Sequence, residues 1–166
     1  MKRESNPAKK IDLEDKLSKI LKKKCLIVCM GNELLGDDGI GVYIARKLLE
    51  RGFSNVLNAE IYLENYIGYI SALKPELILF IDAVEADMNP GDVILGKLPN
   101  IEKKIRVLTT HGLPLSMIIK LISLNLRHVE AYLLGIQVSK VALGEKMSKE
   151  VKKTGDFIVR ILSSLN

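Results

Sequence analysis

The sequence has 166 residues, of which 48% are hydrophobic and 27% are charged. These values are typical of one globular domain, and no apolar run reaches the roughly 18 residues that a membrane-spanning helix needs. The net charge of +5 comes entirely from residues 1–24, which hold nine Lys and Arg against four acids. Because the remainder is balanced, the charge does not favour a nucleic-acid-binding domain. The basic start lacks the apolar core of a secretory signal, so we expect a cytoplasmic protein without membrane insertion.

The first predicted element is an amphipathic helix over residues 11–24. Its apolar stripe consists of Ile11, Leu13, Leu17, Ile20 and Leu21. Because charged side chains cover its other sides, this helix should dock on the domain through that stripe. We therefore predict a basic amphipathic helical extension over residues 1–24, followed by a single domain over residues 25–166. Contact with an acidic partner or a membrane surface is the less favoured role for the extension.

Strand-like and helix-like patterns alternate after Cys25. The predicted strands are Cys25–Met30, Asn55–Ile61, Leu77–Val84, Asp92–Lys97, Ile105–Leu108 and Ala131–Ile136. The predicted helices are Gly39–Arg51, Tyr66–Leu73, Pro114–Leu124 and Ser148–Leu165. The first and third strands are apolar on both faces, as in parallel strands covered by helices. The pattern predicts an α/β fold, a three-layer αβα sandwich around a mostly parallel twisted sheet of about five strands.

The stretch GNELLGDDGIG, residues 31–41, joins the first strand to the first helix of this domain. A glycine-rich turn in this position often binds phosphate through backbone N–H groups and a lysine. Here Asp37 and Asp38 stand where the anion would lie, which makes a nucleotide-binding domain a weak alternative. Either aspartate could cap the following helix, but one cap leaves the other aspartate unexplained.

Two further polar residues follow strands. Asp82 comes at the end of the very apolar strand in LILFIDAVEAD, and His111 lies in RVLTTHGLPL, just before a helix. Taken alone, Asp82 could cap a turn and His111 could be a hydrogen-bonded loop residue. Ligands of open α/β sheets bind beyond the carboxyl ends of the strands, where these residues and Asp38 could converge. Two carboxylates and an imidazole suit a divalent transition metal such as nickel or zinc, with coordination completed by water or substrate.

Three motifs occur in a fixed order, namely GNELLGDDGIG, LILFIDA and TTHGLPL, and LLGIQ follows at residues 133–137. With this set the sequence resembles the nickel–iron hydrogenase maturation endopeptidases, in particular the branch that processes the large subunit of formate-hydrogenlyase-type hydrogenases. The resemblance implies an endopeptidase that removes the carboxyl-terminal extension of a hydrogenase large-subunit precursor after nickel insertion. It also implies that the enzyme recognises the nickel of its substrate, holds no organic cofactor, and acts as a monomer.

The resemblance assigns Asp38, Asp82 and His111 as the metal-binding and catalytic residues. Asp37 would cap a helix or orient its neighbour, and Asn32 would hold the turn through side-chain hydrogen bonds. One departure is the run NAEIYLEN, residues 58–65, which lacks the glycines common there in the family. An alternative function is a nickel-dependent binding or chaperone module that recognises the precursor without cutting it.

Overall fold

The computed structural model describes residues 7–107, 113–126 and 128–165. Within these residues the strands are β1 (Cys25–Met30), β2 (Val56–Glu60), β3 (Leu77–Glu85), β4 (Val93–Lys97), β5 (Arg106–Val107) and β6 (Glu130–Gln137). The α-helices are α1 (Pro7–Ile20), α2 (Ile40–Glu50), α3 (Ile67–Leu73), α4 (Leu115–Ser123) and α5 (Lys149–Ser164). Three short 3-10 helices are η1 (Glu33–Gly39), η2 (Leu63–Tyr66) and η3 (Asn100–Lys103).

The sheet follows the spatial order β2-β1-β3-β6-β4. Strands β2, β1, β3 and β6 run parallel to one another, whereas β4 pairs antiparallel with β6 at one edge. The short strand β5 pairs antiparallel with the end of β3. The predicted mostly parallel sheet is therefore confirmed, and each predicted strand lies within one residue of an observed strand at both ends.

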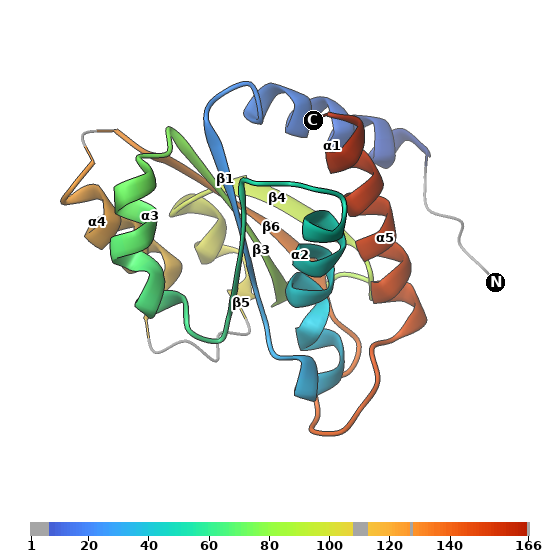
Figure 1. The fold of residues 1–166 in the computed structure, drawn as a ribbon. Coiled ribbons are helices and arrows are strands. Elements are labelled where there is room, and N and C mark those ends of the chain that lie inside the picture. Colours follow the sequence, from blue (N-terminus) through green and yellow to red (C-terminus); the bar gives the residue numbers. More distant parts are fainter. Residues whose placement is uncertain (1–6, 108–112, 127, 166) are drawn as a thin grey trace.

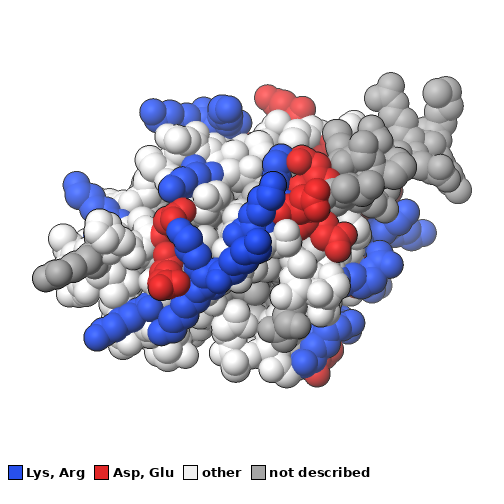
Figure 2. All heavy atoms as spheres, turned by 90° about the horizontal axis from the view of Figure 1, so that it is seen from above, with Lys and Arg blue, Asp and Glu red and all other residues white. Residues whose placement is uncertain are grey.

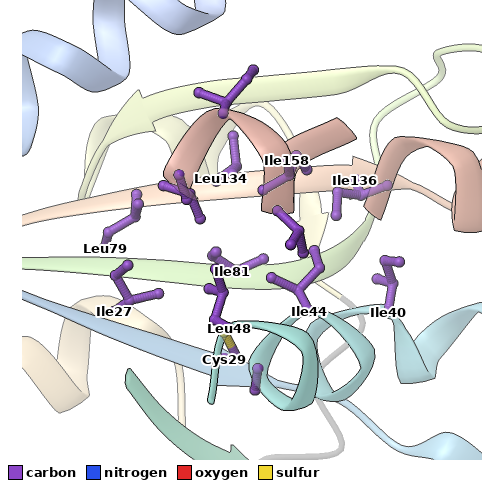
Figure 3. Packing of buried hydrophobic residues seen from close by; sticks show 14 of the residues in the cluster. Ile27, Cys29, Ile40, Ile44, Leu48, Leu79, Ile81, Leu134, Ile136 and Ile158 are labelled. Carbon is purple, nitrogen blue, oxygen red and sulfur yellow. The ribbon is translucent and has the colours of Figure 1, made fainter. Parts of the chain in front are cut away.

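Helices cover both faces of the sheet, as Figure 1 shows, with α2 and α5 on one face and α3 and α4 on the other. Side chains along β1 alternate between the two layers. Ile27 and Cys29 pack toward α2 and α5, and Val28 packs toward α3 and α4. Figure 3 shows the first of these layers, in which aliphatic side chains of the sheet meet α2 and α5. The predicted three-layer sandwich is therefore confirmed, and Cys25 and Cys29 are both free.

Helix α1 lies at the amino-terminal end of the strands, where β1 begins (Figure 1). It docks through Leu13 and Leu17, which are buried in the layer that contains α2 and α5. The predicted helix over residues 11–24 is wrong at both bounds, because α1 begins at Pro7 and ends at Ile20. The chain leaves the helix before Lys24 because the backbone of Lys24 bonds to Glu76 and Leu77 at the start of β3.

The face beyond α1 carries lysine, arginine and acidic side chains close together, as Figure 2 shows. Lys16 pairs with Asp12, and Lys23 and Lys97 both pair with Glu130. The positive charge of the extension is therefore partly compensated within the described residues. None of the helices in the described ranges is long and apolar enough to cross a membrane.

Candidate functional site

The turn after β1 is packed directly onto the end of the sheet. A Cβ atom at Gly31 would lie 2.0 Å from the carbonyl oxygen of Asp38, and one at Gly41 would lie 1.9 Å from the carbonyl oxygen of Met30. Real Cβ atoms do not come this close to backbone oxygens, so both positions require glycine. The glycines of this turn thus bring the backbone of η1 and the start of α2 against β1, and they place Asp38 at the carboxyl edge.

Asn32 holds the start of this turn. Its side-chain oxygen accepts a hydrogen bond of 3.0 Å from the backbone N–H of Leu34, as predicted for a turn asparagine. Its own backbone N–H donates to Oδ2 of Asp38 at 3.0 Å. Asp38 is 1% exposed, so this hydrogen bond fixes a buried carboxylate at the end of β1.

Asp37 binds a segment that is distant in the sequence. Its carboxylate accepts hydrogen bonds from the backbone N–H groups of Ser139 at 2.7 Å, Lys140 at 3.0 Å and Ser148 at 2.6 Å, and from the Ser148 hydroxyl at 3.0 Å. Burial alone would raise the pKa of Asp37, but these hydrogen bonds lower it overall. Asp37 is therefore a stable anion that ties η1 to the connection between β6 and α5.

The alternative in which Asp37 or Asp38 caps the following helix is wrong. The residue that caps α2 is Gly39, which provides no side-chain hydrogen bond, so neither aspartate caps that helix. Ser148 stands just before α5, and its hydroxyl donates to Asp37 and makes no side-chain cap. Both carboxylate oxygens of Asp37 accept hydrogen bonds from the segment of Ser139 to Ser148, so they do not bind the N–H groups at the start of α2.

Asp82 lies inside β3 and not at its end, because the strand continues to Glu85 by pairing with β5 and β6. The pairing of β1 with β3 ends at Ile81, so Asp82 comes where β1 separates from β3. Alternation along the strand places Asp82 on the same face as Phe80, toward α3 and α4. Asp82 therefore lies just beyond the carboxyl end of the parallel pairing between β1 and β3.

The carboxylate of Asp82 is poorly stabilised. It is 1% exposed, and its Oδ1 accepts a hydrogen bond of 2.8 Å from the N–H of Ala83. Its Oδ2 has no hydrogen-bond partner among the described residues. Burial raises the pKa of Asp82 well above its usual value, and the negative charge of Asp38 raises it further. The side chain is thus a buried carboxyl with an acceptor atom available to a ligand.

The charges of these side chains act on one another's surroundings at the end of the sheet. Asp38 acts on the pKa of Asp82, and Asp82 in turn adds to the burial that raises the pKa of the Cys29 thiol. Two buried carboxylates close together repel each other and are costly to ionise in the absence of a cation. A divalent cation bound between Asp38 and Asp82 would remove this repulsion, and carboxylate oxygens are suitable ligands for it. The pair therefore fits a metal ion chemically.

His111, the third predicted ligand, lies outside the described residues. Helix α4 begins four residues after it, at Leu115, and packs on the face to which Asp82 points. Within the described ranges, no group of three or more His, Cys, Asp or Glu side chains is arranged to hold a metal ion. The structure thus brings together Asp38 and Asp82, and the role of His111 stays a prediction.

The glycine-free run, residues 58–65, begins inside β2 and contacts the turn through Glu60. Glu60 adopts a left-handed backbone conformation, with φ at 49°, and its carbonyl oxygen accepts a hydrogen bond of 3.1 Å from the N–H of Gly31. A glutamate thus supports a conformation that glycine adopts more easily. The absence of glycine in this run does not prevent the chain from bending toward the site.

Sequence reasoning missed the segment from Ser139 to Ser148, which binds Asp37. Three of the four donors are backbone N–H groups, and all lie 102 to 111 residues away from Asp37. Backbone donors leave no mark in a sequence. This contact could be recognised only once the segment after β6 was placed beside η1.

Comparison with known proteins gives a consistent result. Residues 42–164 match the family model of HycI, described as hydrogenase maturation protease; this range contains Asp82 and His111 and begins after Asp38. The hydrogenase 3 maturation protease of Escherichia coli K12 is 30% identical over 139 residues, covering 82% of this chain and 87% of that protein. The crystal structure of the HycI protease from Thermococcus kodakarensis superposes with a TM-score of 0.76 at 28% identity, covering 90% of this chain and 97% of the other. HybD from the same organism gives a TM-score of 0.71 at 30% identity, covering 86% and 98%.

Proposed function

We propose that this chain, which belongs to the HycI family of hydrogenase maturation proteases, removes the carboxyl-terminal extension of a nickel–iron hydrogenase large-subunit precursor. Membership of this family makes the chain a hydrolase that processes hydrogenase precursors. The dependence on nickel and the large-subunit extension as the cleaved segment are the parts that we propose. A cytoplasmic location remains the expectation from the sequence.

The observation that carries the proposal is the buried pair of Asp38 and Asp82 at the carboxyl edge of the sheet. A protease that held a permanent metal ion would gain most from a complete set of ligands. Here the described residues provide two carboxylates, and Asp82 keeps one oxygen without a partner. Even with His111 as a third ligand, this set would leave coordination positions open for water or for the precursor, which supports an ion that arrives with the precursor.

In this proposal the nickel of the precursor serves for both recognition and positioning. Binding of the ion by Asp38 and Asp82, together with His111, would fix the scissile segment against the edge of the sheet, which lowers the entropic part of the barrier. The ion could polarise the scissile carbonyl or lower the pKa of a bound water, and both routes fit a metal-assisted hydrolysis. Asp37 would act by holding the turn that carries Asp38.

The test is to incubate the chain with a purified large-subunit precursor, with and without nickel loading, and to measure the mass of the precursor. A shortened product that forms only with nickel is the expected result. Asp38→Asn and His111→Ala should abolish the product while the circular dichroism spectrum stays unchanged. Asp15→Asn is the matched control, because Asp15 is exposed on α1 at the opposite edge of the sheet, and this variant should cleave normally.

A non-cleaving binding module is the second candidate, since it would use the same carboxylates. It predicts a nickel-dependent complex with the precursor and no change in mass. Normal cleavage by both site variants would instead show that the metal-site assignment is wrong, while the cleavage itself would still identify a protease.

A further inference from the structure

The connection between β6 and α5 is an exposed loop whose two ends lie close together. Residues 139–146 are eight consecutive exposed residues. Ser139 and Lys140 at the start of the loop and Ser148 at its end all donate hydrogen bonds to the carboxylate of Asp37. One buried side chain therefore holds the two ends of the loop together, which is the geometry of an Ω-loop, a class of loop that is frequently functional.

The body of the loop is also fixed to the turn η1. The N–H of Asp37 donates to the carbonyl of Lys140, and the N–H of Gly144 donates to the carbonyl of Leu34, both at 3.0 Å. Figure 1 shows the loop beside η1, at the end of the sheet opposite to α1. The loop buries none of the side chains of residues 139–146, so these contacts do not serve to complete the hydrophobic core.

The loop and the turn together present large apolar side chains to solvent. Leu34 is 66% exposed, Leu143 is 79% exposed and Val141 is 37% exposed. We call these three residues the apolar platform. Because hydrogen bonds already hold its two segments, a partner that binds the platform loses little conformational freedom in the protein, which favours binding. Exposed apolar side chains that are held in this way are typical of a protein contact surface.

We propose that the apolar platform of Leu34, Val141 and Leu143 docks an apolar segment of the hydrogenase precursor; this rests on the proposed function. The position of the platform argues for this occupant. Leu34 lies four residues before Asp38, across a kink at Leu35 and Gly36, so a protein that brings an ion to Asp38 comes close to the platform. Lys140 and Glu145 of the loop pair with each other at 4.0 Å, and Lys146 is one further exposed charge beside the apolar side chains.

The test compares binding and cleavage of the nickel-loaded precursor by Leu34→Ser, Leu143→Ser and Leu124→Ser. Leu124 is the matched control, because it is 76% exposed but follows α4, away from η1 and the loop. Each platform variant should weaken precursor binding, or raise KM, by about tenfold, as expected for a contact at the centre of an interface. The control should change by less than about twofold. The value of kcat and the melting temperature should stay near those of the unchanged chain.

Two outcomes would contradict the proposal that the apolar platform docks the precursor. Equal precursor binding by the platform variants and the Leu124→Ser control would show that the precursor does not contact it. A concentration-dependent dimer in light scattering that is lost in Leu34→Ser and Leu143→Ser would show that a second copy of this chain covers it. Both outcomes are separate from failure of the proposed function, which is read from the mass of the precursor after incubation with the unchanged chain.

Discussion

Three aspartates of this chain are buried near one edge of the sheet, and their environments differ. Asp37 accepts four hydrogen bonds, so its pKa is lowered despite burial. Asp38 accepts a backbone hydrogen bond from Asn32. Asp82 accepts one from its own neighbour, and its pKa is raised by burial and by the charge of Asp38. The residue that the fold stabilises least is therefore the one best placed to interact with a ligand, a pattern common at functional sites.

Replacement of this carboxyl should stabilise the fold while it removes function. The raised pKa of Asp82 means that the folded chain binds its proton more tightly than the unfolded chain does. Stability is therefore fully present below the unfolded pKa of about 4 and decreases as the pH rises from there toward the folded pKa. Asp82→Asn removes this titration, so at pH 7 its free energy of unfolding should exceed that of the unchanged chain.

Urea unfolding at pH 4 and pH 7 measures this effect. The gain from Asp82→Asn should be large at pH 7 and small at pH 4, and precursor cleavage should be lost. The control is Asp15→Asn, an exposed substitution of the same kind, which should change stability by less than about 0.5 kcal/mol at either pH. An Asp82→Asn variant that is less stable than the unchanged chain at pH 7 would contradict the environment described for this residue.

At the scale of the elements, the strands could be predicted from the sequence and the turn between them could not. Strand β1 and the first five residues of β3 are continuous apolar runs, and this pattern depends only on burial, so both strands could be located. The bounds of α1 were wrong because its apolar stripe begins only at Ile11, after the helix has begun at Pro7, and because Leu21 extends the stripe beyond the helix end at Ile20. The contacts of Asp37 depend on backbone groups more than 100 residues away, which no local pattern contains.

The sequence also singled out the two buried carboxylates of the candidate site, and their role as metal ligands stays a prediction. Asp82 stood out because a lone carboxyl in a very apolar stretch is unusual, and Asp38 stood out because one helix cap cannot explain two adjacent aspartates. The sequence did not distinguish the roles of Asp37 and Asp38, since that difference comes from which of them faces Ser148 and which faces Asp82. The resemblance to a family supplied the assignment of Asp38.

The end of α3 gives a prediction at the scale of one element. Lys74 ends this helix in a left-handed conformation, with φ at 48°. A residue with a side chain is strained there and glycine is not, so Lys74→Gly should raise the free energy of unfolding by about 0.5–1 kcal/mol. Gly52 has φ at 83°, and a Cβ atom there would meet nothing within 4 Å, so Gly52→Ala isolates the backbone effect. That variant should lose about 1 kcal/mol, measured by urea unfolding. A lower free energy of unfolding in Lys74→Gly would contradict the proposed backbone strain at Lys74.

At the scale of the whole molecule, α1 completes the hydrophobic layer that contains α2 and α5. Leu17 is fully buried in that layer although it comes from the extension, whereas the charged residues of α1 between residues 12 and 20 remain exposed. The extension is therefore integrated into the packing of the domain. Helix α1 lies at the end of the sheet opposite to Asp38, and Figure 2 shows lysine, arginine and acidic side chains mixed on the face seen from that side. This arrangement favours the packing role over a role in binding the precursor.

Removal of this contact should destabilise the entire chain. Leu17→Ala leaves a cavity under α1 and should lower the free energy of unfolding by about 2–5 kcal/mol, measured by urea unfolding. Lys19→Ala is the control on the exposed side of the same helix and should change stability by less than about 0.5 kcal/mol. Equal stability of the two variants would mean that α1 is detached from the domain in solution.

The closed ends of the connection between β6 and α5 have a consequence for how such proteases could diversify. Because Asp37 brings both ends of that connection to one point, residues could be inserted or exchanged between them without displacing α5 or the sheet. A relative that serves a different hydrogenase could thus acquire a new client by replacing this short segment alone, while the pair of carboxylates beside it is inherited unchanged. Exchange of residues 141–146 between two such enzymes would be the natural way to transplant client preference.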